Sequence, residues 1–284
     1  MPRPGNLMQT KLPILTALMF ATASPVLGGE PRGAERIVQS TFKLFNKSST
    51  ATCFLVHLED APDEPIIVSA AHVFERMEGD HALLVLRKPQ PDGGFVRHDH
   101  KVNVRDGKKN LWTKHPKLDI AVLRMAVKPG DVPCPSLPHS LLADEAEVKR
   151  RGLTVGDRLL VLTYPERFEA NDAGFPVARN ATIASFPLTP ISRYESFLAD
   201  FTTFGGDSGG PAFLFGEDKS APLPIVGIVV SKYRHDEKIV SMNEERTVHH
   251  PLGIGKVLHA QHVIDTIALA TKDKGQAAPQ VEGK

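Results

Sequence analysis

A run of glycines around a single serine constrains this chain more than any other feature of its sequence. The run reads GGDSGGP at residues 205–211, and the apolar residues 212–215 that follow read as a strand. Glycine permits positive φ angles and close backbone approach, so consecutive N–H groups can turn toward one point. Such a turn can present a nucleophilic serine and stabilise an oxyanion. A plain tight turn and a phosphate-binding loop are the alternatives, although a phosphate loop needs a lysine and a following helix.

A serine hydroxyl needs a base, and His72 is a candidate because it ends the apolar segment at residues 66–72. A histidine in such a segment can also be a core residue with its hydrogen bonds satisfied. Asp119 favours the catalytic interpretation, since it immediately precedes an apolar segment and its burial without a donor would be costly. The N–H of a histidine would satisfy this carboxylate, fix the ring tautomer and leave the other ring nitrogen for Ser208.

Short apolar runs bounded by turn residues predict a β-rich chain. They occupy residues 66–68, 82–86, 159–162 and 225–230. Residues 131–150 are rich in proline and then in charge, which predicts a linker with a short helix. Apolar residues recur at the helical period near the C-terminus and predict a helix there: Val263, Ile264, Ile267 and Ala268.

The order His72, Asp119, Ser208 is one of the known orders of a serine-histidine-aspartate triad. At these residues the sequence resembles the trypsin-like (chymotrypsin-fold) serine proteases, through SAAH ending at His72, DIAVL starting at Asp119 and GDSGGP around Ser208. The resemblance extends over about residues 37–270. It implies an all-β fold of two six-stranded antiparallel Greek-key β-barrels with a C-terminal helix. The implied barrels lie at 35–130 and 151–258, joined by the linker at 131–150 and followed by the helix at 259–270. Residues 271–284 are polar and without periodicity, so we expect a disordered tail there.

The resemblance also implies a serine endopeptidase. Ser208 would attack a peptide carbonyl, His72 would transfer the proton, and Asp119 would stabilise the imidazolium. The backbone N–H groups of Gly206 and Ser208 would form the oxyanion hole. The implied partner is a protein or peptide substrate, and no cofactor is implied. A catalytically silent homologue that binds proteins, or an esterase with the same triad, are the alternatives.

Within that superfamily, the chain looks closer to the bacterial glutamyl-endopeptidase and HtrA-like branches than to digestive trypsins. Two cysteines, Cys53 and Cys134, cannot supply the bridges common in animal members, and they form either one disulfide or two free thiols. The segment at residues 199–206 resembles the HtrA approach to the nucleophile, with Asp207 in place of the usual asparagine. No PDZ domain is expected after the terminal helix.

The resemblance places the primary specificity pocket at residues just before the nucleophile and on a later strand. These substrate-binding candidates are Thr202, Thr203, Val230, Ser231 and Lys232. None of them is a carboxylate, so a preference for arginine or lysine is not expected. We expect small or medium apolar residues before the scissile bond.

Other features of the sequence bear on partners and metals. Histidines cluster at residues 98–100, at 249–250 and at His259 with His262, and we expect solvated surface there and no metal site. The chain has 34 Lys and Arg against 33 Asp and Glu, a near balance that implies no nucleic-acid partner.

The N-terminus resembles a secretory signal peptide. Basic residues precede an apolar run at residues 12–23 with small residues at its end, so we expect cleavage after residue 23, or alternatively after residue 28. The run is shorter than the ~20 residues that span a bilayer, so stable membrane insertion is not expected after cleavage. A secreted or periplasmic location follows from this interpretation.

The residues around Ile37 superficially resemble a zymogen activation site, whose new N-terminus would pair with Asp207. Ile37 lies only four residues before a predicted strand at 41–45, and extended chain reaches at most ~3.5 Å per residue. A reach into the other barrel is therefore disfavoured. We expect Asp207 to pair with some other donor.

Overall fold

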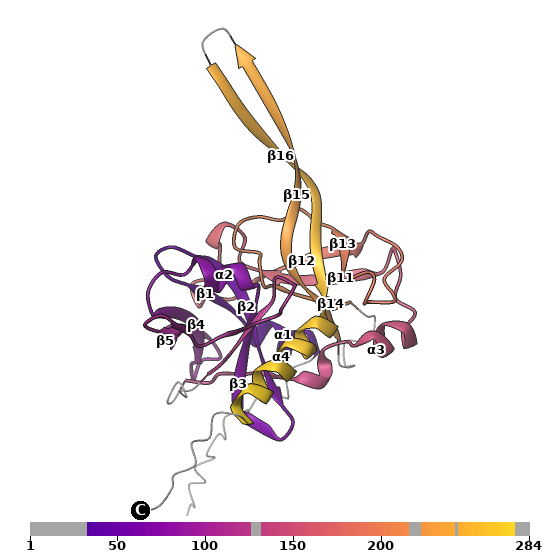
Figure 1. Cartoon of the computed structure of the whole chain (residues 1–284). Coiled ribbons are helices and arrows are strands. Elements are labelled where there is room, and N and C mark those ends of the chain that lie inside the picture. Colours follow the sequence, from indigo (N-terminus) through magenta and orange to yellow (C-terminus); the bar gives the residue numbers. More distant parts are fainter. Residues whose placement is uncertain (1–32, 126–131, 216–222, 242–243, 276–284) are drawn as a thin grey trace, which may run out of the picture. The chain divides into compact units, whose positions relative to one another are not determined.

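The computed structural model describes residues 33–125, 132–215, 223–241 and 244–275 (Figure 1). The predicted signal peptide at residues 1–23, with its alternative end at residue 28, lies outside the described residues. So do residues 276–284 of the predicted tail. The described chain is mostly β-structure, arranged as an N-terminal sheet, a C-terminal barrel and a C-terminal helix.

The N-terminal sheet has the strand order β5-β4-β1-β2-β3-β9-β8, with β10 paired in parallel to β2. The strands predicted at residues 41–45, 66–68 and 82–86 lie within β1, β3 and β4 of this sheet. Their bounds are β1 Thr41–Phe45, β2 Thr50–Leu58, β3 Ala61–Ser69, β4 His81–Pro89, β5 Phe95–Asn103, β8 Thr113–Lys114, β9 Ala121–Arg124 and β10 Leu137–Pro138. Two further short strands, β6 Arg105–Asp106 and β7 Lys109–Asn110, pair only with each other.

The expected closed barrel in the N-terminal half is not seen, because the described strand pairings leave β5 and β8 as open edges. The edge strand β5 is largely exposed and rich in charged and histidine side chains, which are typical of a solvated edge. At the other edge, β8 is only two residues long and ends before Pro116, which has no N–H to donate to a ladder. In the described residues these two edges do not pair with each other.

The C-terminal half does form a closed barrel, with the strand order β11-β12-β13-β16-β15-β14. The bounds are β11 Arg158–Thr163, β12 Val177–Ile183, β13 Ser196–Asp200, β14 Pro211–Leu214, β15 Ile225–Ser241 and β16 Glu244–His259. Alternating buried residues fill its interior, among them Leu159, Val161, Phe197, Val229 and Val257. One six-stranded barrel of the predicted pair is thus present.

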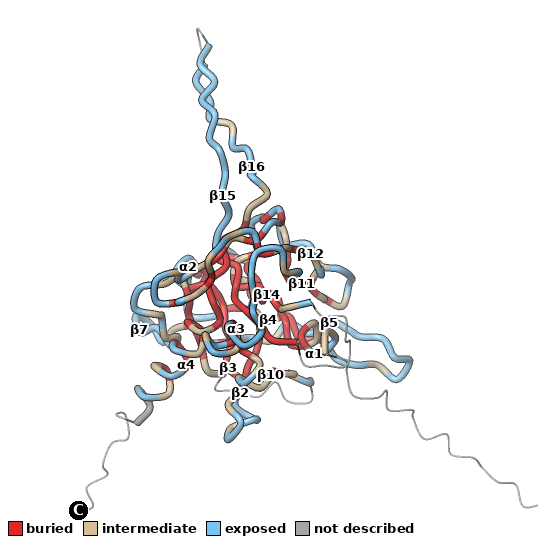
Figure 2. Tube along the Cα trace, turned by 90° about the vertical axis from the view of Figure 1, so that its right-hand side faces the viewer, coloured by how far each residue is buried: buried red, intermediate tan, exposed pale blue. Residues whose placement is uncertain are grey.

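The outer parts of β15 and β16 leave the barrel as a two-stranded hairpin. Strand β15 is buried from Ile225 to Val230 and exposed from Ser231 onward. Figure 2 shows the change as a switch from red to pale blue along both strands. Beyond the barrel, the pairing continues outward as far as Ser241 with Glu244.

Helices and short turns connect these elements. Their bounds are α1 Gly33–Gln39, α2 Ala71–Arg76, η1 His139–Leu141, α3 Glu145–Arg150, η2 Pro165–Arg167 and α4 Ala260–Gly275. The described part of the predicted linker carries β10, η1 and α3. None of the helices among the described residues is long and apolar enough to cross a bilayer.

Helix α4 differs from its prediction in length and in its buried face. It continues to Gly275, so the first residues of the predicted disordered tail are helical. Val263 and Ile267 are buried as predicted, but Ala268 is exposed and Ala270 is buried instead. The helix packs against β9, β8 and β15, and therefore covers the junction of the sheet and the barrel.

Both cysteines are free thiols. Cys53 is buried on β2, and Cys134 is half-buried before β10. Burial raises the pKa of both thiols, that of Cys134 to about 12. Neither is a thiolate at neutral pH, so the structure has the free-thiol alternative.

The side chain of Arg87 on β4 joins the sheet to the segment before β12. It is 5% exposed, and its guanidinium carbon lies 4.4 Å from the ring centroids of Phe42 and Phe175. Its N–H groups donate at 2.7–3.1 Å to backbone carbonyl oxygens of Gln39, Thr41 and Gly174. Among the described residues it makes no ion pair, so carbonyl dipoles and aromatic faces stabilise the buried charge.

We expect Arg87→Met to lower the free energy of unfolding by about 2–4 kcal/mol, because several buried carbonyl oxygens lose their donor. Urea unfolding followed by the fluorescence of Trp112, the single tryptophan, measures this. Lys88→Met on the same strand is the control, since Lys88 is exposed, and it should stay within about 0.5 kcal/mol of wild type. Equal stability of the two variants would contradict this account of Arg87.

Candidate active site

His72 and Asp119 are joined by two hydrogen bonds. His72 lies in α2, the short helix after β3, and not at the end of the strand as predicted. Its backbone N–H donates to Asp119 Oδ1 at 2.8 Å, and its Nδ1 lies 2.6 Å from Asp119 Oδ2. Asp119 occupies the turn between β8 and β9. The carboxylate thus fixes both the backbone and the ring of His72.

The charge on Asp119 sets the tautomer of this ring. Burial acts to raise the pKa of Asp119, but the hydrogen bonds from the ring and backbone of His72 outweigh it, with help from Lys114. The pKa therefore lies below its ordinary value, and Asp119 is ionised at neutral pH. The Nδ1 of His72 then carries the ring proton, and Nε2 is left with a lone pair.

The turn that carries Ser208 is anchored to β2 through Thr52. The N–H of Thr52 donates to the carbonyl of Ser208 at 3.0 Å, and its hydroxyl donates to the carbonyl of Gly206 at 2.8 Å. The same hydroxyl accepts from the N–H of Tyr164 at 3.1 Å. One residue on the N-terminal sheet therefore holds two carbonyls of the turn, one through its backbone and one through its side chain.

Gly209 packs against the strand that leads to His72. A Cβ at this position would lie 2.2 Å from both Ser69 Oγ and the carbonyl of Thr52, and Gly209 has a φ of +86°. Only glycine fits here, and its fit brings Ser208 next to the end of β3. The described residues record no hydrogen bond between the Ser208 hydroxyl and the His72 ring. Such bonds often tighten only when substrate is bound.

Two amides of the turn have no acceptor among the described residues. Between residues 204 and 210, five N–H groups donate to protein oxygens: those of Phe204, Gly205, Asp207, Gly209 and Gly210. The N–H groups of Gly206 and Ser208 make no hydrogen bond with any described residue. Both residues are half-exposed. The two amides that the sequence nominates as oxyanion donors are thus available to a ligand.

Asp207 is paired with Arg179 of β12. Its side chain is 1% exposed, and its Oδ2 accepts from Arg179 Nη1 and from the N–H of Phe204, each at 2.8 Å. The guanidinium carbon lies 5.2 Å from the ring of Phe201 and 5.4 Å from that of Phe204. Burial raises the pKa of Asp207, against the opposing effects of the Phe204 N–H and Arg179.

This pairing supplies the other donor that the sequence requires for Asp207. Ile37, the proposed new N-terminus, is 1% exposed within α1 and belongs to the core around the N-terminal sheet. In the described structure Asp207 Oδ2 therefore already has its donors, and Ile37 is packed elsewhere.

The substrate-binding candidates lie on neighbouring segments. Thr203 is buried, and its methyl group approaches the Cα side of Gly255, where an added Cβ would lie 2.9 Å from it. Gly255 pairs with Lys232 on β15, which brings residues 202–203 and 230–232 together. Thr202, Ser231 and Lys232 are exposed, whereas Val230 is 5% exposed and packs in the core. Val230, at a bulge of β15, therefore packs in the core and supports the exposed candidates beside it.

The histidine clusters divide into two kinds. The residues at 98–100 and 249–250 lie mainly on exposed strand surfaces, as expected. His259 and His262 do not, because the turn from β16 into α4 directs both toward the core, where they are 1% and 8% exposed. The expectation of solvated surface is wrong for this pair.

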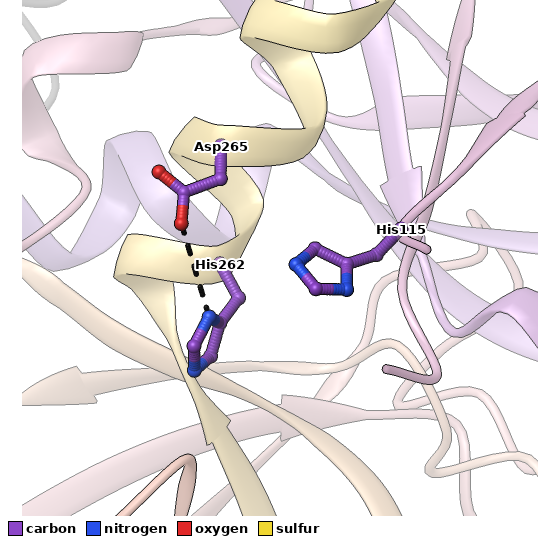
Figure 3. Close-up of side chains that lie close together, drawn as sticks. All are labelled: His115, His262 and Asp265. Carbon is purple, nitrogen blue, oxygen red and sulfur yellow. Dashed lines mark ion pairs between the residues drawn. The ribbon is translucent and has the colours of Figure 1, made fainter. Parts of the chain in front are cut away.

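His262 lies near His115 and Asp265, and one possible ligand atom from each lies within 4.8 Å of the others (Figure 3). The donor set does not fit a metal ion. The Nδ1 of His115 accepts from two backbone N–H groups, those of Lys117 and Leu118, so the ring proton sits on Nε2. A metal on Nε2 would move that proton to Nδ1, where it would oppose both donors.

Three residues at the site carry no distinguishing signal in the sequence. Thr52 reads as an ordinary strand residue, and Arg179 and Glu166 contact the turn only through tertiary packing. A requirement for some donor to Asp207 was the single indication available. It did not specify which of the many basic residues would serve.

No family model matches the chain, and no curated protein matches its sequence. Among solved structures, its fold is similar to the crystal structure of the protease Anisep from Arthrobacter nicotinovorans, with a TM-score of 0.50. The two are 13% identical in sequence, and the match covers 85% of this chain and 99% of that chain. At this identity the likeness concerns the fold alone.

We expect Arg179→Met to destabilise the protein by about 3–5 kcal/mol, because it leaves the carboxylate of Asp207 buried with one remaining donor. Adding Asp207→Asn should recover a large part of this loss, since the uncompensated charge is then removed. A double-mutant cycle measured by urea unfolding tests the pairing. Strict additivity of the two single variants would show that the pair is not coupled.

Proposed function

We propose that this chain is a serine endopeptidase of the trypsin-like class. The observation that carries the proposal is a pair of amides, those of Gly206 and Ser208, that donate to none of the described residues and lie on a turn anchored beside the His72–Asp119 pair. Amides turned toward one point stabilise a developing oxyanion. The similar fold of a solved protease supports the same class of chemistry.

In the proposed first step, Ser208 Oγ attacks the carbonyl carbon of a peptide bond while His72 Nε2 takes the hydroxyl proton. The imidazolium that forms is stabilised by the ionised Asp119. The N–H groups of Gly206 and Ser208 bind the oxyanion of the tetrahedral intermediate. His72 then donates its proton to the leaving amine, which departs and leaves an acyl-enzyme on Ser208.

In the second step, water attacks the acyl-enzyme and His72 Nε2 takes one of its protons. The oxyanion again lies against the two amides. Collapse of the intermediate breaks the bond to Ser208, whose oxygen recovers the proton from His72. The carboxylic acid product leaves, and the site returns to its starting state.

The proposal extends to specificity and location. Thr203 and Val230, the buried residues among the pocket candidates, are uncharged, which favours small or medium apolar residues before the scissile bond. The signal-like N-terminal sequence favours export, either to the periplasm or out of the cell.

We expect a fluorophosphonate to label the wild-type protein once, at Ser208, and to leave Ser208→Ala unlabelled. Intact mass and peptide mapping locate the adduct. His72→Ala and Asp119→Asn should lower kcat against peptide substrates by about 10⁴-fold or more, because the proton acceptor or its tautomer is lost. Asp265→Asn, near another histidine, is the control and should stay near wild type.

Absence of labelling on folded wild-type protein would contradict the proposal and favour a silent homologue. Cleavage of short esters without cleavage of peptides would favour an esterase.

We expect a peptide-library profile dominated by small or medium apolar residues before the cleaved bond. The physical reason is that none of the candidate pocket residues is a carboxylate, and the buried ones, Thr203 and Val230, are uncharged. Mass spectrometry of the cleaved library gives the profile. A profile dominated by Arg, Lys or Glu would contradict this part of the proposal.

A further inference from the structure

The turn at residues 164–167 lies behind Gly205 and has an unusual backbone. Glu166 has a φ of 47° and Arg167 a φ of 70°, so two consecutive residues other than glycine are left-handed. Such conformations persist only where the surrounding contacts require them. The contacts of this turn are therefore informative.

Glu166 holds both ends of Gly205. Its backbone N–H donates to the carbonyl of Gly205 at 2.5 Å, and its side-chain Oε1 accepts from the N–H of Gly205 at 2.8 Å. The next residue is packed on the same turn, since a Cβ at Gly206 would lie 2.2 Å from the carbonyl oxygen of Tyr164. The left-handed backbone at Glu166 accompanies this two-point contact.

The contact fixes the direction of one amide of the nucleophile turn. In a trans peptide the C=O and the N–H point in opposite directions. Because the C=O of Gly205 points to Glu166, the N–H of Gly206 points away from Glu166. Neither Gly205 nor Gly206 has a Cβ to resist rotation of the peptide between them. The side chain of Glu166 restrains the preceding peptide, because Oε1 holds the N–H of Gly205. Without Oε1, Gly205 could rotate, its C=O could leave the backbone N–H of Glu166, and the peptide could turn over and direct a carbonyl where the amide of Gly206 now lies.

We propose that Glu166 is a positioning residue that keeps the N–H of Gly206 directed into the oxyanion hole. The inference rests on the proposed function, because it assigns a task to Glu166 only if Gly206 is an oxyanion donor. Glu166 is exposed, and its carboxylate acts here as a hydrogen-bond acceptor for Gly205 and not as a proton donor to substrate.

Glu166→Gly isolates the side-chain contact. Glycine adopts a positive φ without strain, so this variant keeps the backbone bond to Gly205 and removes only Oε1. Glu166→Asn is a second variant that tolerates the same backbone but has a shorter side chain. Glu166→Gln keeps an acceptor at the same reach. Asp172→Gly removes a charge from the same loop, and its side chain makes no hydrogen bond or ion pair with the described residues.

We expect Glu166→Gly and Glu166→Asn to lower kcat about tenfold with KM within about twofold, because an oxyanion contact acts mainly in the transition state. Affinity for a peptide boronate, which resembles the tetrahedral intermediate, should fall in parallel. Glu166→Gln and Asp172→Gly should stay within about threefold of wild type in both measurements. Thermal unfolding of each variant separates this effect from loss of fold.

The outcomes separate this inference from the proposed function. An unreactive wild-type protein overturns both. A reactive wild type with unchanged kcat in Glu166→Gly and Glu166→Asn overturns the positioning role alone, as does a loss in Glu166→Gln equal to that in Glu166→Gly. A rise in KM without a fall in kcat also overturns it, because the contact would then serve substrate binding.

Discussion

The hydrogen bonds of Thr52 are the interaction on which the candidate site depends. This residue lies on the N-terminal sheet, yet it binds carbonyls on both sides of Asp207 in the C-terminal half. Its backbone and its hydroxyl act together, so the turn is fixed at two carbonyls that lie two residues apart. His72 is reached along the neighbouring strand β3, which pairs with β2. The geometry of the site is therefore the geometry of one strand pair.

The glycines of the turn serve close approach more than flexibility. At Gly206, Gly209 and Gly210 an added Cβ would lie within 2.6 Å of a backbone carbonyl oxygen. The clashes at Gly206 and Gly210 involve Tyr164 and Leu162, just after and within the end of β11, and the clash at Gly209 involves Thr52 of β2, so the turn is packed between two segments. The same close packing leaves most of the turn's polar groups bonded and the amides of Gly206 and Ser208 free. If these amides are the oxyanion donors of the proposed function, the rigid surroundings preorganise them.

Local patterns in the sequence identify much of this structure. The apolar runs that predict strands all lie within strands. The glycine turn, His72 and Asp119 are far apart in the chain, but each is recognisable from its own neighbouring residues. Features that depend on contacts between distant segments could not be predicted from these local patterns. Closure of the N-terminal sheet depends on whether its edge strands β5 and β8 pair with each other, which no local pattern specifies. The sequence led us to expect His259 and His262 on a solvated surface. Their burial depends on how α4 packs, which the sequence does not show.

The partners of buried charges were equally inaccessible. The sequence indicates that Asp207 needs a donor, but it does not show which one. Arg179 becomes that donor because the barrel places β12 beside the nucleophile turn. The contact of Glu166 with Gly205 could not be predicted either, since nothing in the sequence distinguishes this exposed glutamate after a proline from any other. Side chains that act through tertiary contacts are found from coordinates and not from motifs.

The long hairpin of β15 and β16 places two extremes of environment on the same pair of strands. At one end these strands are barrel walls with buried neighbours on both sides, and at the other they have only each other. Amide hydrogen exchange should therefore slow by orders of magnitude along a single strand, from the hairpin's outer pairs to its inner ones. The position along the strands at which the amide exchange rate falls would mark where the barrel begins.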